Sequence, residues 1–106
     1  MIARTTVLLL LITHCVAATA QPLPVRSNKT DSQQKRQGEW SVWMDGLWQP
    51  TTDSTQVAYY RIITYKNDKP IGITKDFFRN GKIQFEGILI EDRPEDMYEG
   101  VCTWYY

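Results

Sequence analysis

The sequence has few of the residues on which small enzymes and metal sites depend. Its 106 residues include one histidine, His14, and two cysteines, Cys15 and Cys102. It also has no excess of charge, since 12 Lys and Arg balance 12 Asp and Glu. Nucleic-acid-binding proteins cluster cationic side chains to displace counterions, so we expect no nucleic-acid partner. The length leaves room for one small domain.

Residues 1–20 are typical of a secretory signal peptide. Arg4 precedes an apolar stretch over residues 7–12, and Ala-Thr-Ala at residues 18–20 forms a small-residue cleavage site. This pattern predicts cleavage before Gln21 and an exported protein, either periplasmic or extracellular. The apolar stretch is shorter than the about 20 residues of a membrane-spanning helix, so we expect no transmembrane segment after cleavage.

Removal of residues 1–20 leaves a chain with no histidine and one cysteine, Cys102. A Ser-His-Asp triad and a Cys-His pair both need an imidazole, and zinc sites need several Cys or His ligands. An intrachain disulfide needs a second cysteine. We therefore predict no catalytic residues, no metal and no cofactor.

Residues 21–38 lack aromatic residues and are rich in Gln, Ser, Lys and Pro. Such a segment cannot bury enough apolar surface to offset its ordering entropy, so it is predicted to be a flexible linker. Two short motifs lie in it: an N-x-T glycosylation sequon at Asn28 and a dibasic pair, Lys35-Arg36. Both have meaning only in a eukaryotic secretory pathway, and both also arise by chance in polar segments.

Residues 39–106 are predicted to form an all-β domain. All four Trp, six Tyr and three Phe lie between Trp40 and Tyr106. Alternating or β-branched patterns predict four strands, over residues 57–65, 71–78, 83–89 and 98–106. Asn80-Gly81 predicts a type I′ turn, which needs positive φ at both central residues, and residues 66–70 predict another turn. The expected fold is an antiparallel meander, preceded by a further hairpin near residues 45–46.

A glycine precedes a β-branched residue at Gly72, Gly87 and Gly100. At a shift of 28 residues the pattern G-[IV]-x-x-x-aromatic-aromatic occurs twice, beginning at Gly72 and at Gly100. A repeat of this length indicates serial hairpins that cover one another. The glycines are expected where side chains of an adjacent hairpin cross the backbone.

Phe-Phe-Arg-Asn-Gly-Lys-Ile at residues 77–83, together with the glycine and paired tyrosines of residues 100–106, resembles the bacterial variant of the MORN repeat. The resemblance covers about residues 57–106; the loop over residues 92–96 departs from that repeat's tight turn. It implies an elongated meander of β-hairpin repeats without catalytic residues. Some members of that family are labelled antitoxins, and ordinary MORN proteins are linked to scaffolding and lipid binding.

Several side chains are candidates for an interaction surface. Exposed aromatic rings stack on sugars or lie at lipid interfaces, but in a small domain they also build the core. Cys102 is expected either to be a small buried residue or to form an intermolecular disulfide. The acidic residues at 91–99 lack the order of a calcium-binding loop and are expected to be solvated. The candidate interaction residues are Trp40, Trp43, Trp48, Tyr98, Trp104 and Tyr106.

The function expected from the sequence is that of an exported, non-enzymatic interaction or scaffold module that binds an unknown protein partner. One alternative is a small secreted ligand or pro-protein that is cut at Lys35-Arg36. Another is a periplasmic antitoxin or immunity-type protein. The strand over residues 98–106 contains no Lys or Pro to protect its edge. It is expected to pair with a second copy, with a partner strand or with the segment around residues 40–48.

Overall fold

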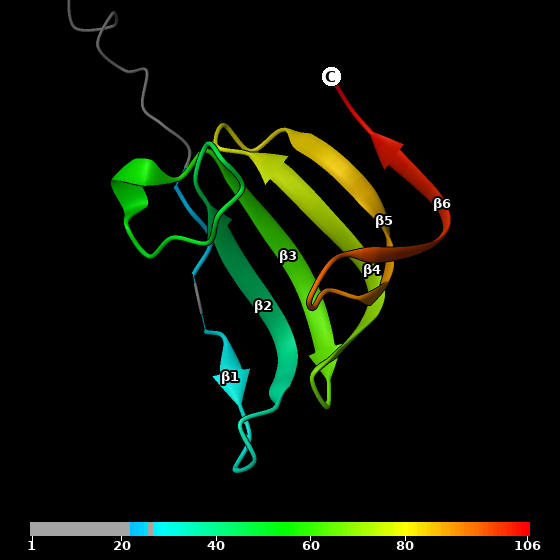
Figure 1. The fold of residues 1–106 in the computed structure, drawn as a ribbon. Coiled ribbons are helices and arrows are strands. Elements are labelled where there is room, and N and C mark those ends of the chain that lie inside the picture. The colour runs from blue at the N-terminus through cyan, green and yellow to red at the C-terminus, as the bar shows by residue number, and fades with distance from the viewer. Residues whose placement is uncertain (1–21, 26) are drawn as a thin grey trace, which may run out of the picture.

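The computed structural model describes residues 22–25 and 27–106, which form one six-stranded antiparallel sheet (Figure 1). The strands follow one another in the sheet in chain order, so the fold is a meander and the predicted all-β class is confirmed. One short 3-10 helix, η3, spans Ser54–Gln56. The strands are β1 (Lys29–Thr30), β2 (Arg36–Met44), β3 (Tyr59–Lys66), β4 (Lys69–Phe78), β5 (Ile83–Glu91) and β6 (Met97–Trp104).

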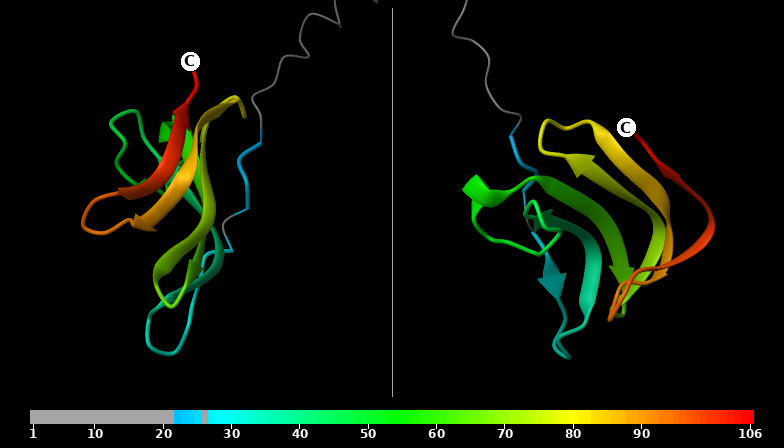
Figure 2. Two further views of the ribbon diagram at one scale, coloured as in Figure 1. Left: turned by 90° about the vertical axis from the view of Figure 1, so that its right-hand side faces the viewer. Right: turned by 45° about the horizontal axis from the view of Figure 1, so that its top comes forward.

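The sheet is strongly twisted and curled, and the loop between β5 and β6 bends back over one face (Figures 1 and 2). We call this the inner face and the opposite one the outer face. Arg36 of β2 hydrogen-bonds Asp92 of that loop. The largest fully buried side chains come from β3, β4 and β5 and lie on the inner face: Ile63, Thr74, Phe85 and Leu89.

The four predicted strands correspond to β3–β6, but the type I′ turn lies at the other of the two predicted turns, at residues 67–68. Asn67 and Asp68 have φ of 50° and 70°, which is the positive-φ pair that a two-residue type I′ hairpin needs. At the β4–β5 turn only Gly81 has positive φ, 89°. Its N–H donates to the carbonyl of Phe78 at 2.8 Å. The type I′ prediction at Asn80-Gly81 is therefore wrong, although the position of the turn is right.

Order begins earlier than the predicted linker boundary. Residues 29–30 of β1 pair with residues 36–37 of β2, inside the segment predicted to be flexible over 21–38. The carboxylate of Asp31 accepts hydrogen bonds from the backbone N–H of Gln33 and Lys35 and so closes the turn. The loop over residues 45–58 contains a short hairpin at the expected place, because Met44 and Pro50 form an antiparallel bridge and the N–H of Asp45 donates to the carbonyl of Gln49.

The 28-residue spacing of the sequence coincides with a shared irregularity of β4 and β6. Residues 62 and 64 of β3 pair with residues 75 and 71 of β4, so a step of two residues in β3 lies opposite a step of four in β4. The same bulge occurs in β6, where residues 103 and 99 pair with residues 86 and 88 of β5. Gly72 and Gly100 lie in these bulges with φ of 71° and 69°. The residues that follow these two glycines, Ile73 and Val101, are both exposed.

Gly87 has a different role from those two glycines. A Cβ atom at Gly87 would lie 2.7 Å from Sγ of Cys102 and 2.8 Å from Cζ of Phe85. The expectation that side chains cross close to the glycine backbone therefore holds at this position, whereas at Gly72 and Gly100 the space is open.

The predicted signal peptide, residues 1–20, lies outside the residues that the structure describes. Among the residues that it does describe, no helix is long and apolar enough to cross a bilayer.

Candidate binding groove

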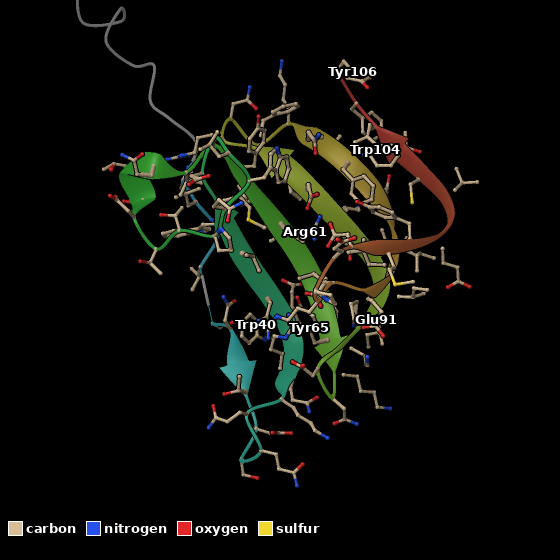
Figure 3. All side chains as sticks on the ribbon, in the orientation of Figure 1. Trp40, Arg61, Tyr65, Glu91, Trp104 and Tyr106 are labelled. Atoms are coloured by element: carbon tan, nitrogen blue, oxygen red, sulfur yellow. The ribbon has the colours of Figure 1, made fainter. Side chains whose placement is uncertain are left out.

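The inner face carries a groove of about 840 Å³. Five of the six predicted interaction residues border it: Trp40, Trp43, Trp48, Tyr98 and Trp104. Of these, Trp43 lies opposite Tyr60 in the sheet, so its side chain is directed to the outer face. Tyr106 does not, and it is fully exposed at the end of the chain. Figure 3 shows Trp40 and Tyr65 toward one end of the inner face, Trp104 toward the other and Arg61 between them. The fold therefore gathers aromatic residues that are separated by more than half of the chain.

A cluster of three aromatic rings forms the β5–β6 side of the groove. The ring centroid of Phe85 lies 5.6 Å from that of Tyr98 and 4.9 Å from that of Trp104, and the last two are 5.9 Å apart. Phe85 is 1% exposed, whereas Tyr98 and Trp104 are 45% and 47% exposed. Phe85 thus supports two rings that keep open surface.

The β2–β3 side is also aromatic. Trp40 packs edge-on against Tyr65 at 5.7 Å, and its Nε1–H donates to the backbone carbonyl of Lys29. Trp48, in the loop after β2, stacks on Tyr59 at 4.2 Å. The rings on this side are held in place by their neighbours.

The first of two ion networks below the groove is centred on Arg36. Its guanidinium lies 4.0 Å from the centre of the Tyr65 ring and is 2.6 Å from Oδ1 of Asp68. It also donates two hydrogen bonds to the carboxylate of Asp92, at 2.8 and 3.0 Å. The hydroxyl of Tyr65 donates to the same carboxylate. This network links β2, the β3–β4 turn and the β5–β6 loop.

The second network is centred on Arg61 of β3. Its guanidinium donates two hydrogen bonds to Asp76, at 2.7 and 3.0 Å. It donates two more to Asp96, at 3.1 and 2.9 Å. Asp76 lies opposite Arg61 on β4, whereas Asp96 reaches it from the β5–β6 loop. Arg61 therefore bridges the floor of the groove to the loop that overhangs it.

The environment shifts the pKa values of acidic side chains in both networks. Burial would raise the pKa of Asp92, but hydrogen bonds from Arg36 and Tyr65 outweigh it and hold that pKa below its usual value. For Asp76 burial prevails, and its pKa is raised despite Arg61. Burial followed by the bond to Asp92 raises the pKa of Tyr65, which keeps its hydroxyl protonated as a donor.

One expectation about polarity is wrong. The acidic segment at 91–99 is not simply solvated, because Asp92 and Asp96 turn inward to the two arginines. In β4, Ile71 and Ile73 are exposed, whereas Asp76 is buried. The arginines attract the carboxylates to the inner face, and a charge is buried only when paired. A charged residue inside a β-branched strand, such as Arg61, is the sequence signal for this network.

The outer face has a patch that the sequence did not indicate. Five β-branched aliphatic side chains from β4, β5 and β6 are 39% to 89% exposed, and we call them the outer aliphatic patch: Ile71, Ile73, Ile88, Ile90 and Val101. Ile73 lies directly opposite Ile88 in the sheet. Ile73, Ile88 and Val101 border a shallow hollow of about 240 Å³.

Strand β6 pairs with β5 and has no second neighbour among the described strands. The segment around residues 40–48 does not cover it, because β2 pairs with β3, so that alternative for the edge is wrong. The thiol of Cys102 is free and half-buried beside Gly87. Pairing of β6 with a second copy, with or without a disulfide at Cys102, stays a prediction.

Neither a family model, nor a curated protein, nor a solved structure matches this chain. The resemblance to the MORN variant therefore stays a prediction from the residues quoted above.

Proposed function

We propose that this protein is an exported, non-enzymatic module that binds a partner protein through the outer aliphatic patch. The patch is the observation that carries the proposal. An antiparallel sheet with one open face normally presents polar side chains to water there. Here the open face presents five exposed aliphatic side chains, three of which border one hollow, and exposed apolar patches are characteristic of protein-binding sites. The occupant we expect is an apolar protein surface.

The groove supports the non-enzymatic part of the proposal. A general acid needs a carboxyl group that holds its proton near neutral pH. Asp92 instead accepts hydrogen bonds from Arg36 and Tyr65, and its pKa lies below the usual value. Asp96 accepts two hydrogen bonds from Arg61. The pKa of Asp76 is raised by burial, but both of its oxygens accept hydrogen bonds from Arg61.

The local structure at the two processing motifs weighs against a pro-protein. Arg36 is 4% exposed and hydrogen-bonds Asp68 and Asp92, so a protease would have to unfold this region to bind it. The side chain of Asn28 exchanges two 2.9 Å hydrogen bonds with the backbone of Ser41, which ties the sequon to the edge of β2. An antitoxin or immunity role would be one form of the proposed protein binding, with a toxin as the partner.

The patch is tested by site-specific photo-crosslinking from position 88 in the exported protein. The partner should be captured by the parent and lost in Val101→Lys. The matched control is Leu47→Lys, which changes a side chain of similar exposure in the loop after β2 and should retain the partner. Equal capture by the two variants, or none by the parent, would contradict the proposal. N-terminal sequencing tests export, with Gln21 expected as the first residue.

A further inference from the structure

We propose that the inner groove is a second binding site, and that its ligand is a neutral saccharide. Tyr98 and Trp104 would provide the stacking surface, and the carboxylates held by Arg36 and Arg61 would accept hydrogen bonds from the sugar hydroxyls. The site lies on the face opposite the outer aliphatic patch and does not depend on the protein partner proposed above.

The exposed rings of the groove carry the first part of the argument. Tyr98 and Trp104 face the groove with almost half of their surface open, while Phe85 behind them is buried. Aromatic rings that only build a hydrophobic core stabilise the fold by being buried, and these two rings are not. Aromatic faces of this kind suit an amphipathic ligand with flat apolar C–H faces. A sugar ring has such faces.

The hydrogen-bonding groups of the groove point to the same ligand class. Each of the two guanidinium groups already donates four hydrogen bonds. The carboxylates of Asp92 and Asp96 retain acceptor capacity, because an ionised carboxylate has about four lone-pair sites. Gln84 also lines the groove, and no hydrogen bond is made to its Oε1. The groove therefore has acceptors to offer and fits a ligand that is rich in donors.

The charge and the donors of the groove give no support to other ligand classes. The charged residues that line the groove are three arginines and three aspartates, so its net charge is zero and favours neither an anionic nor a cationic ligand: Arg36, Arg61, Arg93, Asp76, Asp92 and Asp96. A peptide would bring carbonyl groups that need donors, whereas Arg36 and Arg61 already donate four hydrogen bonds each. The volume of about 840 Å³ lies within the range of about 300–1,000 Å³ that is usual for small-ligand sites. A short neutral saccharide satisfies the size, the charge and the hydrogen-bonding pattern together.

The experiment is a calorimetric and tryptophan-fluorescence titration of the purified full chain with four neutral oligosaccharide probes. These are hexamers of glucose, mannose, galactose and N-acetylglucosamine, and glucosamine hexamer and hexalysine test cationic ligands. We expect at least one neutral hexamer to bind. Trp104→Ala should weaken that binding at least about tenfold through loss of stacking. Gln84→Leu should weaken it severalfold, which provides a second variant if Trp104→Ala folds poorly.

Two controls separate this site from the rest of the molecule. Tyr106→Ala removes an exposed aromatic ring outside the groove, and Val101→Lys changes only the outer aliphatic patch; both should bind the saccharide as the parent does. Absence of binding by every neutral hexamer at about 10 mM would overturn the proposal. So would binding of hexalysine alone, or equal binding by the parent and both groove variants. Loss of the protein partner in Val101→Lys with retained saccharide binding would leave the two proposals independently supported.

Discussion

Arg61→Met should be among the most destabilising substitutions in this chain. The Arg61 side chain is 10% exposed and that of Asp76 only 4%, with 2.7 Å between Nε and Oδ1. Methionine keeps much of the side-chain volume but leaves the buried carboxylate of Asp76 without its cation. Removing one partner of a buried ion pair typically costs about 3–5 kcal/mol. That is a large share of the about 5–15 kcal/mol by which native proteins are stable.

A double-mutant cycle separates the ion pair from simple loss of packing. Asp76→Asn leaves Arg61 paired with Asp96, so its cost should be nearer about 1–2 kcal/mol. In the double variant no buried charge remains unpaired at Asp76, and the total loss should be smaller than the sum of the two by more than about 1 kcal/mol. Urea unfolding followed by tryptophan fluorescence measures each free energy. Additive losses would refute the reasoning.

The pH dependence of Arg61→Met gives an independent check. Burial already raises the pKa of Asp76, and loss of the arginine should raise it further. A carboxyl whose pKa is higher in the folded state destabilises the fold only when ionised. The deficit relative to the parent should therefore be largest at pH 7 and shrink toward the unfolded-state pKa of about 4. An equal deficit at both pH values would mean that the effect is packing alone.

Three further predictions concern other parts of the fold. Gly87→Ala should lower the free energy of unfolding by about 1–3 kcal/mol, because its Cβ would meet Cys102; an unchanged urea midpoint would contradict this. Gly81→Val should cost about 1–3 kcal/mol through strain at positive φ, and coincident thermal melts would refute it. In Asp92→Asn the free energy of unfolding should fall less steeply than in the parent as the pH drops below about 4. In the parent this fall comes from protonation of Asp92, whose pKa is lowered by hydrogen bonds although burial would raise it. Parallel curves of unfolding free energy against pH would contradict this prediction.

The sequence by itself determined the class of the fold and the position of four of its six strands. Alternation and turn chemistry act between residues close in the chain, so β3–β6 and the turns at residues 66–70 and 79–82 could be located in advance. The sequence also offered six aromatic residues as candidates for an interaction surface. Five of the six border one groove, and their role in binding stays a prediction.

Only the tertiary structure decided which face of each strand is buried. Alternation defines two faces without naming the inner one, and in β4 the isoleucines are outside while Asp76 is inside. That choice depends on Arg61, which lies in the neighbouring strand opposite Asp76. In the same way Arg36 belongs to β2 rather than to a linker, because Asp68 and Asp92 arrive from distant parts of the chain. Buried charges are stable only in pairs, and pairing across the sheet is a property of the folded chain.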